Sequence, residues 1–207
     1  MDARIVVLCG DQGTDEWRML RLGIPTASNF AEVMAKGKDG GKSITRRKYL
    51  LTLLGERLTG EVVDGYSNAH MERGKVMEAE ARDLYTFRTD AAIQQVSFVR
   101  NDEVSAGASP DALIGADGLL EIKTRLPALQ LDLLLSGGLP AEHKAQVQGQ
   151  LLITGRQWVD FVSYWPKLPI HICRVERDEP YIATLRQAIA DFNGELAALS
   201  ERFAEAA

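Results

Sequence analysis

The chain has 207 residues, 45% hydrophobic and 26% charged, and this ordinary globular composition excludes intrinsic disorder, a collagen-like repeat and a disulfide scaffold. At this length we expect residues 1–207 to fold as one domain. The two cysteines, Cys9 and Cys173, have no Cys or His at metal-ligand spacing, which predicts a reducing cytosol and no zinc site. Because every apolar run is shorter than a membrane span, no membrane partner is expected.

The charge is unevenly distributed along the chain. A formal net charge of −5 argues weakly against a nucleic-acid partner, yet residues 36–57 carry seven basic side chains against two acidic ones. Taken alone, such a run is typical of a solvated loop that leads into a helix.

Helical periodicity dominates the first half of the chain. After a short strand at residues 5–9, apolar spacing predicts helices around residues 17–21, 30–34, 43–58 and 69–87. Thr26 or Ser28 is a candidate N-cap for the second of these helices. In the helix at 43–58 we expect Ile44, Tyr49 and Leu53 on the buried side.

The second half alternates strands and helices. Strand composition marks residues 93–99, 119–124, 158–165 and 170–175, and helical spacing marks 128–135, 140–154 and 179–203. Together with the first half, this order predicts an α+β fold in which helices flank a central mixed β-sheet.

The segment from Asp111 to Lys123 carries the most informative chemistry. Strand side chains alternate between faces, so Glu121 and Lys123 share one face of an otherwise apolar strand. Charges on a strand near the centre of a sheet need a partner or a function. A structural ion pair is the alternative interpretation of this pattern.

The hairpin geometry decides whether Asp111 reaches the same site. A two-residue turn at 116–117 would pair Asp111 with Ile122 and separate the two acids, whereas an odd-length loop pairs Asp111 with Glu121 directly. A bulge or bend beside Pro110 is the other geometry that would bring the two acids together. Two carboxylates in one pocket favour a divalent cation, and oxygen ligands select Mg²⁺ or Mn²⁺ over zinc. With Lys123 beside the metal, this pattern is typical of phosphodiester hydrolysis.

The spacing matches the PD-(D/E)XK nuclease signature, and most of the chain resembles the lambda exonuclease group of phage recombination nucleases, the YqaJ-like viral recombinases. The matching segments are residues 17–28 (WRMLRLGIPTAS), 74–78 (GKVME), 109–111 (SPD), 120–123 (LEIK) and 145–148 (AQVQ). The resemblance implies a restriction-endonuclease-like core.

The resemblance also implies roles for single residues near the metal. Asp111, Glu121, Glu78 and the backbone carbonyl of Ile122 match metal ligands, so that two ions are expected per active site. Lys123 matches the catalytic lysine, and Gln146 matches a glutamine beside the lysine and the catalytic water. On its own sequence context, Glu78 would be interpreted as a solvated helix residue.

A second set of residues matches contacts to the 5′-phosphate of a DNA end. These are Arg21, Ser28 and Ser109. The guanidinium of Arg21 can bind phosphate through two hydrogen bonds. For Ser28 the alternative role is a simple N-cap, which can coexist with phosphate binding. Trp17, one helical turn before Arg21, is expected to position it, and the basic residues 36–48 would flank the DNA entrance. His143 is left outside the catalytic set.

The activity implied by the resemblance is a Mg²⁺-dependent 5′-to-3′ exonuclease that leaves a 3′ single-stranded tail, with Mn²⁺ as a possible substitute ion. Its implied partners are double-stranded DNA ends and a single-strand annealing protein, its assembly a ring-shaped homotrimer, and its setting the host cytosol of a phage or prophage. The alternatives are a structure-specific endonuclease of the same superfamily and a DNA-end-binding module without catalysis.

Overall fold

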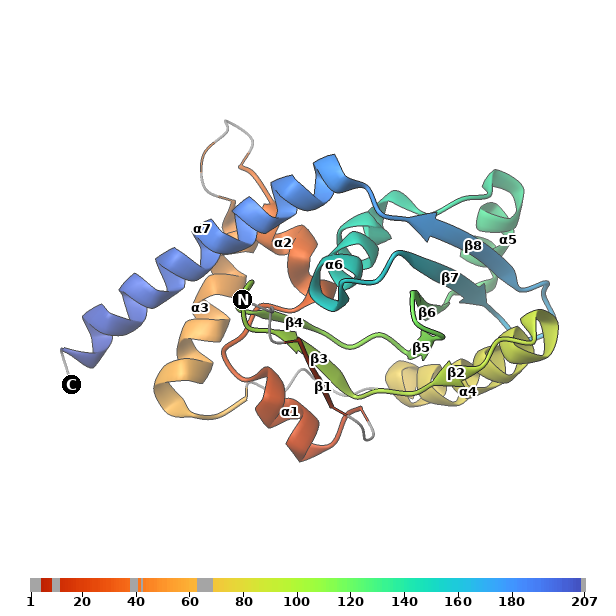
Figure 1. The fold of residues 1–207 in the computed structure, drawn as a ribbon, viewed down its shortest axis with the longest axis horizontal. Helices are drawn as coiled ribbons and strands as arrows, with labels where there is room; N and C mark the ends of the chain where they lie inside the picture. The colour runs from red at the N-terminus through yellow and green to blue at the C-terminus, as the bar shows by residue number, and fades with distance from the viewer. Residues whose placement is uncertain (1–4, 9–11, 38–40, 42, 63–68, 206–207) are drawn as a thin grey trace.

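The computed structural model describes residues 5–8, 12–37, 41, 43–62 and 69–205. Its centre is a five-stranded mixed sheet in the order β2-β5-β6-β7-β8 (Figure 1). Strands β6 and β7 are parallel, and the other neighbours are antiparallel. The strands of this sheet are β2 (Ile93–Gln94), β5 (Ala112–Ile114), β6 (Gly118–Thr124), β7 (Trp158–Tyr164) and β8 (His171–Glu176).

A smaller antiparallel sheet lies beside the central one, in the order β1-β3-β4. It consists of β1 (Ile5–Leu8), β3 (Phe98–Asn101) and β4 (Ala106–Ala108). The prediction of one strand over 93–99 was therefore wrong, because the chain changes sheets between Gln94 and Phe98. The predicted mixed sheet with flanking helices is confirmed.

The helices lie close to their expected positions. They are α1 (Asp15–Arg21), α2 (Phe30–Met34), α3 (Ile44–Thr59), α4 (Ala69–Thr89), α5 (Pro127–Ser136), α6 (Lys144–Thr154) and α7 (Glu179–Ala204), with 3₁₀ turns η1 (Ala27–Asn29) and η2 (Ala141–His143). Two details differ. The predicted helix 140–154 begins as a 3₁₀ turn, and Ile44 is 88% exposed instead of buried.

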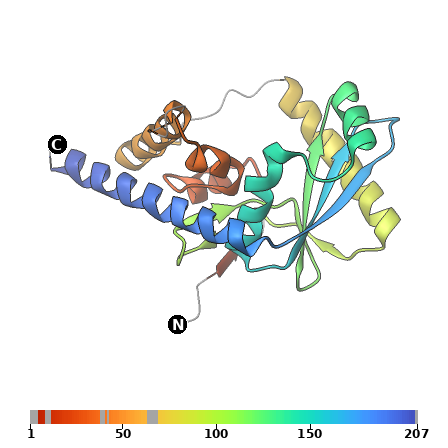
Figure 2. The same cartoon turned by 90° about the horizontal axis from the view of Figure 1, so that it is seen from above.

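The two faces of the central sheet are covered by different helices. Side chains of α4, such as Tyr85, pack on Leu120 and Ile122, whereas α6 and α7 pack on Leu119 and Phe161. Figure 2 shows α4 on one side of the strands and α6 on the other. Glu121 and Lys123 alternate with Leu120 and Ile122, so they belong to the face that α6 covers.

One glycine sets the distance between α6 and the N-terminal helices. A Cβ on Gly149 would lie 2.3 Å from Cδ2 of Phe30, a fully buried residue of α2. The bare backbone of α6 therefore packs directly on the Phe30 ring. None of the helices among the described residues is both long and apolar enough to cross a membrane.

Candidate active site

The β5–β6 hairpin has an odd-length loop, one of the two geometries expected from the sequence. Leu113 pairs with Leu119 and Ile114 with Gly118, which leaves three residues, 115–117, in the loop. Asp111 precedes β5 by one residue, and its amide donates to the Leu120 carbonyl at 3.0 Å. The Ile122 amide in turn donates to Asp111 Oδ2 at 2.5 Å. The hairpin therefore places Asp111 opposite Glu121.

Glu121 is the most completely held carboxylate of this site, with 2% of its surface exposed. Lys123 Nζ and Gln146 Nε2 each lie 2.6 Å from its Oε1. Gln150 Nε2 lies 2.5 Å from its Oε2. Three donors thus fix a single carboxylate, two of them from the same face of α6.

Glu78 joins this group from α4, on which it forms an ion pair of 2.6 Å with Arg82. Burial raises the pKa of Glu78, and the Glu121 charge raises it further. Burial also raises the pKa of Asp111 well above its usual range, and the charges of Glu121 and Glu78 add to this effect. We call Glu78, Asp111, Glu121 and Lys123 the acidic centre, because its three carboxylates repel one another.

Lys123 is a cation in this setting. Burial alone lowers the pKa of its ammonium, but the Glu121 carboxylate outweighs burial, and the net pKa is raised. In this arrangement the Lys123 ammonium donates a hydrogen bond to Glu121 Oε1 and supplies positive charge beside the carboxylates.

The acidic centre fits a hard divalent cation in its donor chemistry, since its ligand atoms are carboxylate oxygens and a cation would relieve their repulsion. Among the described residues, however, no three His, Cys, Asp or Glu side chains already converge on one metal position. Glu121 is turned to Lys123 and the glutamines, and Glu78 is turned to Arg82. Metal binding therefore requires Glu78 to turn away from Arg82 and Oε1 of Glu121 to exchange a donor for the ion.

The three residues expected to bind a terminal phosphate are connected in one polar network. Trp17 Nε1 donates to Ser109 Oγ at 3.0 Å, and the Trp17 ring lies 4.1 Å below the Arg21 guanidinium. Arg21 Nη2 approaches Thr26 Oγ1 at 3.4 Å, and this hydroxyl lies 3.3 Å from Ser28 Oγ. We call Trp17, Arg21, Thr26, Ser28 and Ser109 the Arg21 cluster.

The Arg21 cluster lacks the N-cap that the sequence allowed. Neither η1 nor α2 has a side-chain cap hydrogen bond, because Thr26 and Ser28 instead donate to Asn29 Oδ1. The interpretation of Ser28 as a simple N-cap was therefore wrong. Burial lowers the pKa of the Arg21 guanidinium, so a bound anion would replace lost solvation around this cation.

Helix α3 holds the loop that carries the Arg21 cluster. The Tyr49 hydroxyl accepts from the Thr26 amide at 3.1 Å, and Glu56 Oε2 accepts from the Gly23 amide at 2.8 Å. Arg57 Nε donates to the Gly23 carbonyl at 2.7 Å. Gly23 has φ +64°, which favours glycine, and a Cβ there would lie 2.4 Å from Cγ of Arg57.

Sequence reasoning missed Gln150, Arg82, the place of Thr26 in the Arg21 cluster and these α3 contacts. Gln150 carried a signal, because it lies four residues after Gln146 and therefore on the same helical face. Arg82 carried the same signal relative to Glu78. The α3 contacts join residues more than twenty positions apart, and no local pattern marks them.

Two further candidates lie outside the catalytic set. The His143 ring packs 5.1 Å from the Phe161 ring, and burial followed by the Lys123 charge lowers its pKa, so His143 is a neutral neighbour of the acidic centre. In the basic run, Arg46 forms a 2.7 Å ion pair with Glu195 of α7, a structural role, while Lys38 and Lys42 lie outside the described residues.

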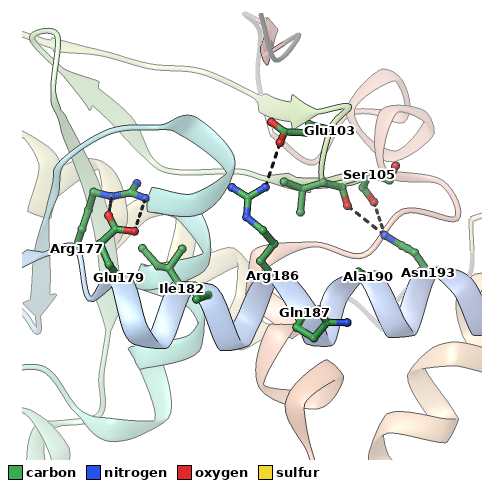
Figure 3. A pocket seen from close by; sticks show the side chains of 11 residues that line it. Glu103, Ser105, Arg177, Glu179, Ile182, Arg186, Gln187, Ala190 and Asn193 are labelled. Carbon is green, nitrogen blue, oxygen red and sulfur yellow. Dashed lines mark hydrogen bonds and ion pairs between the residues drawn. The ribbon is translucent and has the colours of Figure 1, made fainter. Parts of the chain in front are cut away.

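A separate groove runs between α7 and the β3–β4 turn (Figure 3). Its charged side chains already have partners: Arg177 pairs with Glu179 at 2.5 Å and Arg186 with Glu103 at 3.5 Å. The Asn193 amide donates to the carbonyls of Val104 and Ser105. No residue of the acidic centre or the Arg21 cluster lines this groove.

The fold is that of solved exonucleases. An alkaline exonuclease from Laribacter hongkongensis, LHK-Exo, matches with a TM-score of 0.84 and 36% identity, over 93% of this chain and 97% of that chain. LHK-Exo in complex with dAMP matches equally, with a TM-score of 0.84 and 36% identity over 94% of this chain and 100% of that chain. A phage-related exonuclease from Haemophilus somnus 129PT shares the fold, with a TM-score of 0.66 at 14% identity, over 87% and 96% of the two chains.

These matches define the class: the chain is a nuclease. The model of the YqaJ-like viral recombinase domain matches residues 16–157, a span that includes the acidic centre and the Arg21 cluster. The chain belongs to the YqaJ-like viral recombinase family. Comparison with curated proteins found no match.

Proposed function

We propose that this nuclease is a Mg²⁺-dependent 5′-to-3′ exonuclease that digests one strand of duplex DNA from its end and leaves a 3′ single-stranded tail. The observation that carries the proposal is the short link between the two halves of the site. Ser109 binds Trp17 of the Arg21 cluster, and Asp111, two residues later, faces Glu121 of the acidic centre. A DNA strand end bound at the Arg21 cluster would therefore bring a nearby phosphodiester to the acidic centre.

Two Mg²⁺ ions would be held by Asp111, Glu121, Glu78 and the carbonyl oxygen of Ile122, and Mn²⁺ accepts the same oxygen ligands. Bound there, the ions would supply Lewis acidity to the scissile phosphate and an activated water. Their ligands come from the β5–β6 hairpin and from α4, which packs on one face of the central sheet.

Lys123 and Gln146 are the other catalytic residues in this proposal. Both converge on Glu121 Oε1, which supports a shared role in orienting the attacking water. The Lys123 ammonium would also stabilise negative charge that develops on the phosphate oxygens.

Arg21, Ser28 and Ser109 would bind the terminal 5′-phosphate. The Arg21 guanidinium supplies paired donors, and the two hydroxyls supply single donors around it. LHK-Exo was solved with dAMP, a deoxynucleoside monophosphate, which belongs to the product class of exonucleolytic digestion. This supports a site that accepts a nucleotide with a terminal phosphate.

The proposal extends to the assembly and the partner. As its resemblance to the lambda exonuclease group implies, the chain would form a homotrimeric ring around DNA, in the host cytosol of a phage or prophage, and would pass the 3′ tail to a single-strand annealing protein. Sedimentation giving a stable monomer at micromolar concentration would reject the ring.

The test is release of acid-soluble nucleotides from linear duplex DNA with 5′-phosphates, compared with the same DNA as a closed circle, in Mg²⁺ and in EDTA. We expect release from the linear form alone and only with Mg²⁺. Cutting of the circle would replace the proposal by an endonuclease. Binding to duplex ends without hydrolysis at any Mg²⁺ concentration would replace it by an end-binding module.

A further inference from the structure

Among the residues described at this site, Gln150 is the one whose side chain donates a hydrogen bond to Oε2 of Glu121. It lies one helical turn after Gln146 on α6 and is 1% exposed. Gln146 and Lys123 both bind Oε1 of Glu121, whereas Gln150 Nε2 binds Oε2 at 2.5 Å. Each oxygen of this carboxylate therefore has its own amide donor.

This pair of amides fixes the plane of the carboxylate. A carboxylate held through one oxygen can still pivot about that oxygen when its side-chain torsions change together, and the terminal torsion of Glu is broad. Held through both oxygens, Glu121 presents Oε1 to Lys123 in a single orientation. The orientation depends on Gln150, since the other two donors act on the same oxygen.

The fold itself gains little from the Gln150 amide. Its Oε1 is buried without a hydrogen-bond partner among the described residues, and an unpaired buried acceptor is destabilising. Gln148, two residues earlier and 2% exposed, differs: its Nε2 donates to the Glu176 carbonyl and its Oε1 accepts from the Asp178 amide. Gln148 joins α6 to the start of α7, whereas the described contact of the Gln150 amide is with Glu121.

We propose that Gln150 is a positioning residue that sets the orientation of Glu121 for a divalent cation. This inference rests on the proposed function, because it takes Glu121 to be a metal ligand. Partners of metal ligands keep a ligand atom aimed at the ion, and their loss weakens metal binding about 10- to 100-fold.

The test compares Gln150→Met with Gln148→Met, because methionine is also unbranched and fills nearly the same space without an amide. The full-length, DNA-free protein is titrated with Mn²⁺, and free Mn²⁺ is followed by electron paramagnetic resonance. Thermal unfolding without metal and nucleotide release from linear DNA are measured on the same samples.

We expect Gln150→Met to bind Mn²⁺ about 10-fold more weakly than wild type or worse. Gln148→Met should lower the unfolding temperature and leave the Mn²⁺ affinity of the folded protein unchanged. Equal Mn²⁺ affinity in wild type and both variants would overturn the role of Gln150. Wild type that binds Mn²⁺ but releases no nucleotides would overturn the proposed function alone, and wild type that binds no Mn²⁺ would overturn both.

Discussion

The acidic centre draws its side chains from long, regular elements, whereas the Arg21 cluster is assembled from a short helix, a 3₁₀ turn and a residue between strands. Strand β6 and helix α4 supply the acidic centre, apart from Asp111 just before β5, and α6 places Gln146 and Gln150 against Glu121. The Arg21 cluster depends instead on α3, through contacts such as Tyr49 to the Thr26 amide. We therefore expect the two to respond differently to substitution. Changes in the acidic centre should alter the rate of hydrolysis directly, whereas changes around the Arg21 cluster should act by altering the shape of its loop.

The largest effect is expected at the acidic centre. Lys123→Met removes the ammonium next to Glu121 while keeping the length of the side chain, and turnover should fall at least about 100-fold because charge near the transition state is lost. Initial rates of nucleotide release in Mg²⁺ measure this effect, and duplex binding should persist. Lys144→Met on α6, which breaks an ion pair with Asp178, is the control. Turnover like that of wild type would remove Lys123 from the mechanism.

Arg21→Ala should act on the end of the DNA rather than on the chemistry. We expect about a 10-fold loss of kcat/KM on 5′-phosphorylated ends, because a charge-assisted hydrogen bond contributes about 1.5–3 kcal/mol, and a smaller loss on 5′-hydroxyl ends. Arg100→Ala, at an exposed ion pair with Asp102, is the matched control. Equal losses on both kinds of end would contradict a phosphate contact.

Tyr49→Phe tests whether α3 shapes the Arg21 cluster. The Thr26 amide loses its acceptor, so the free energy of unfolding should fall by about 1–3 kcal/mol, and the preference for 5′-phosphorylated ends should weaken. Tyr85→Phe removes a different buried hydroxyl, which donates to Asp160 at 2.7 Å, and should cost stability without changing that preference. Urea unfolding and paired digestion assays measure both effects. An unchanged preference in Tyr49→Phe would show that the loop keeps its shape without this bond.

The smallest effect is a pH dependence of stability confined to the acidic centre. Because the folded pKa of Asp111 is raised, its favourable contribution is complete below its unfolded pKa, near 4, and is lost as the pH rises through the folded pKa. Without metal, Asp111→Asn should therefore be more stable than wild type at pH 8 and lose that advantage toward pH 4. Urea unfolding across this range in EDTA measures it. An advantage that does not change with pH would contradict the raised pKa.

The difference between the two halves also decides what the sequence could predict. Strand alternation placed Glu121 and Lys123 on one face, and the structure confirms the odd loop that brings Asp111 opposite them. Local periodicity carries this information, because both relations lie within one hairpin. The contact between Thr26 and Tyr49 was missed, because it depends on how α3 packs against a distant loop. Ile44 was wrongly expected to be buried. Periodicity indicates which side of a helix is apolar, but not how far along that side the neighbouring elements cover it.

The close contact between Gly149 and Phe30 affects the spacing between the two parts of the candidate active site. Helix α6 brings Gln146 and Gln150 to the acidic centre, while Phe30 begins the helix that follows Ser28. Under the proposed function, this close contact helps to set the distance between the Arg21 cluster, which binds the terminal phosphate, and the acidic centre, where the phosphodiester is hydrolysed. Any side chain at residue 149 would clash with the Phe30 ring, and relief of that clash would change the distance between the Arg21 cluster and the acidic centre.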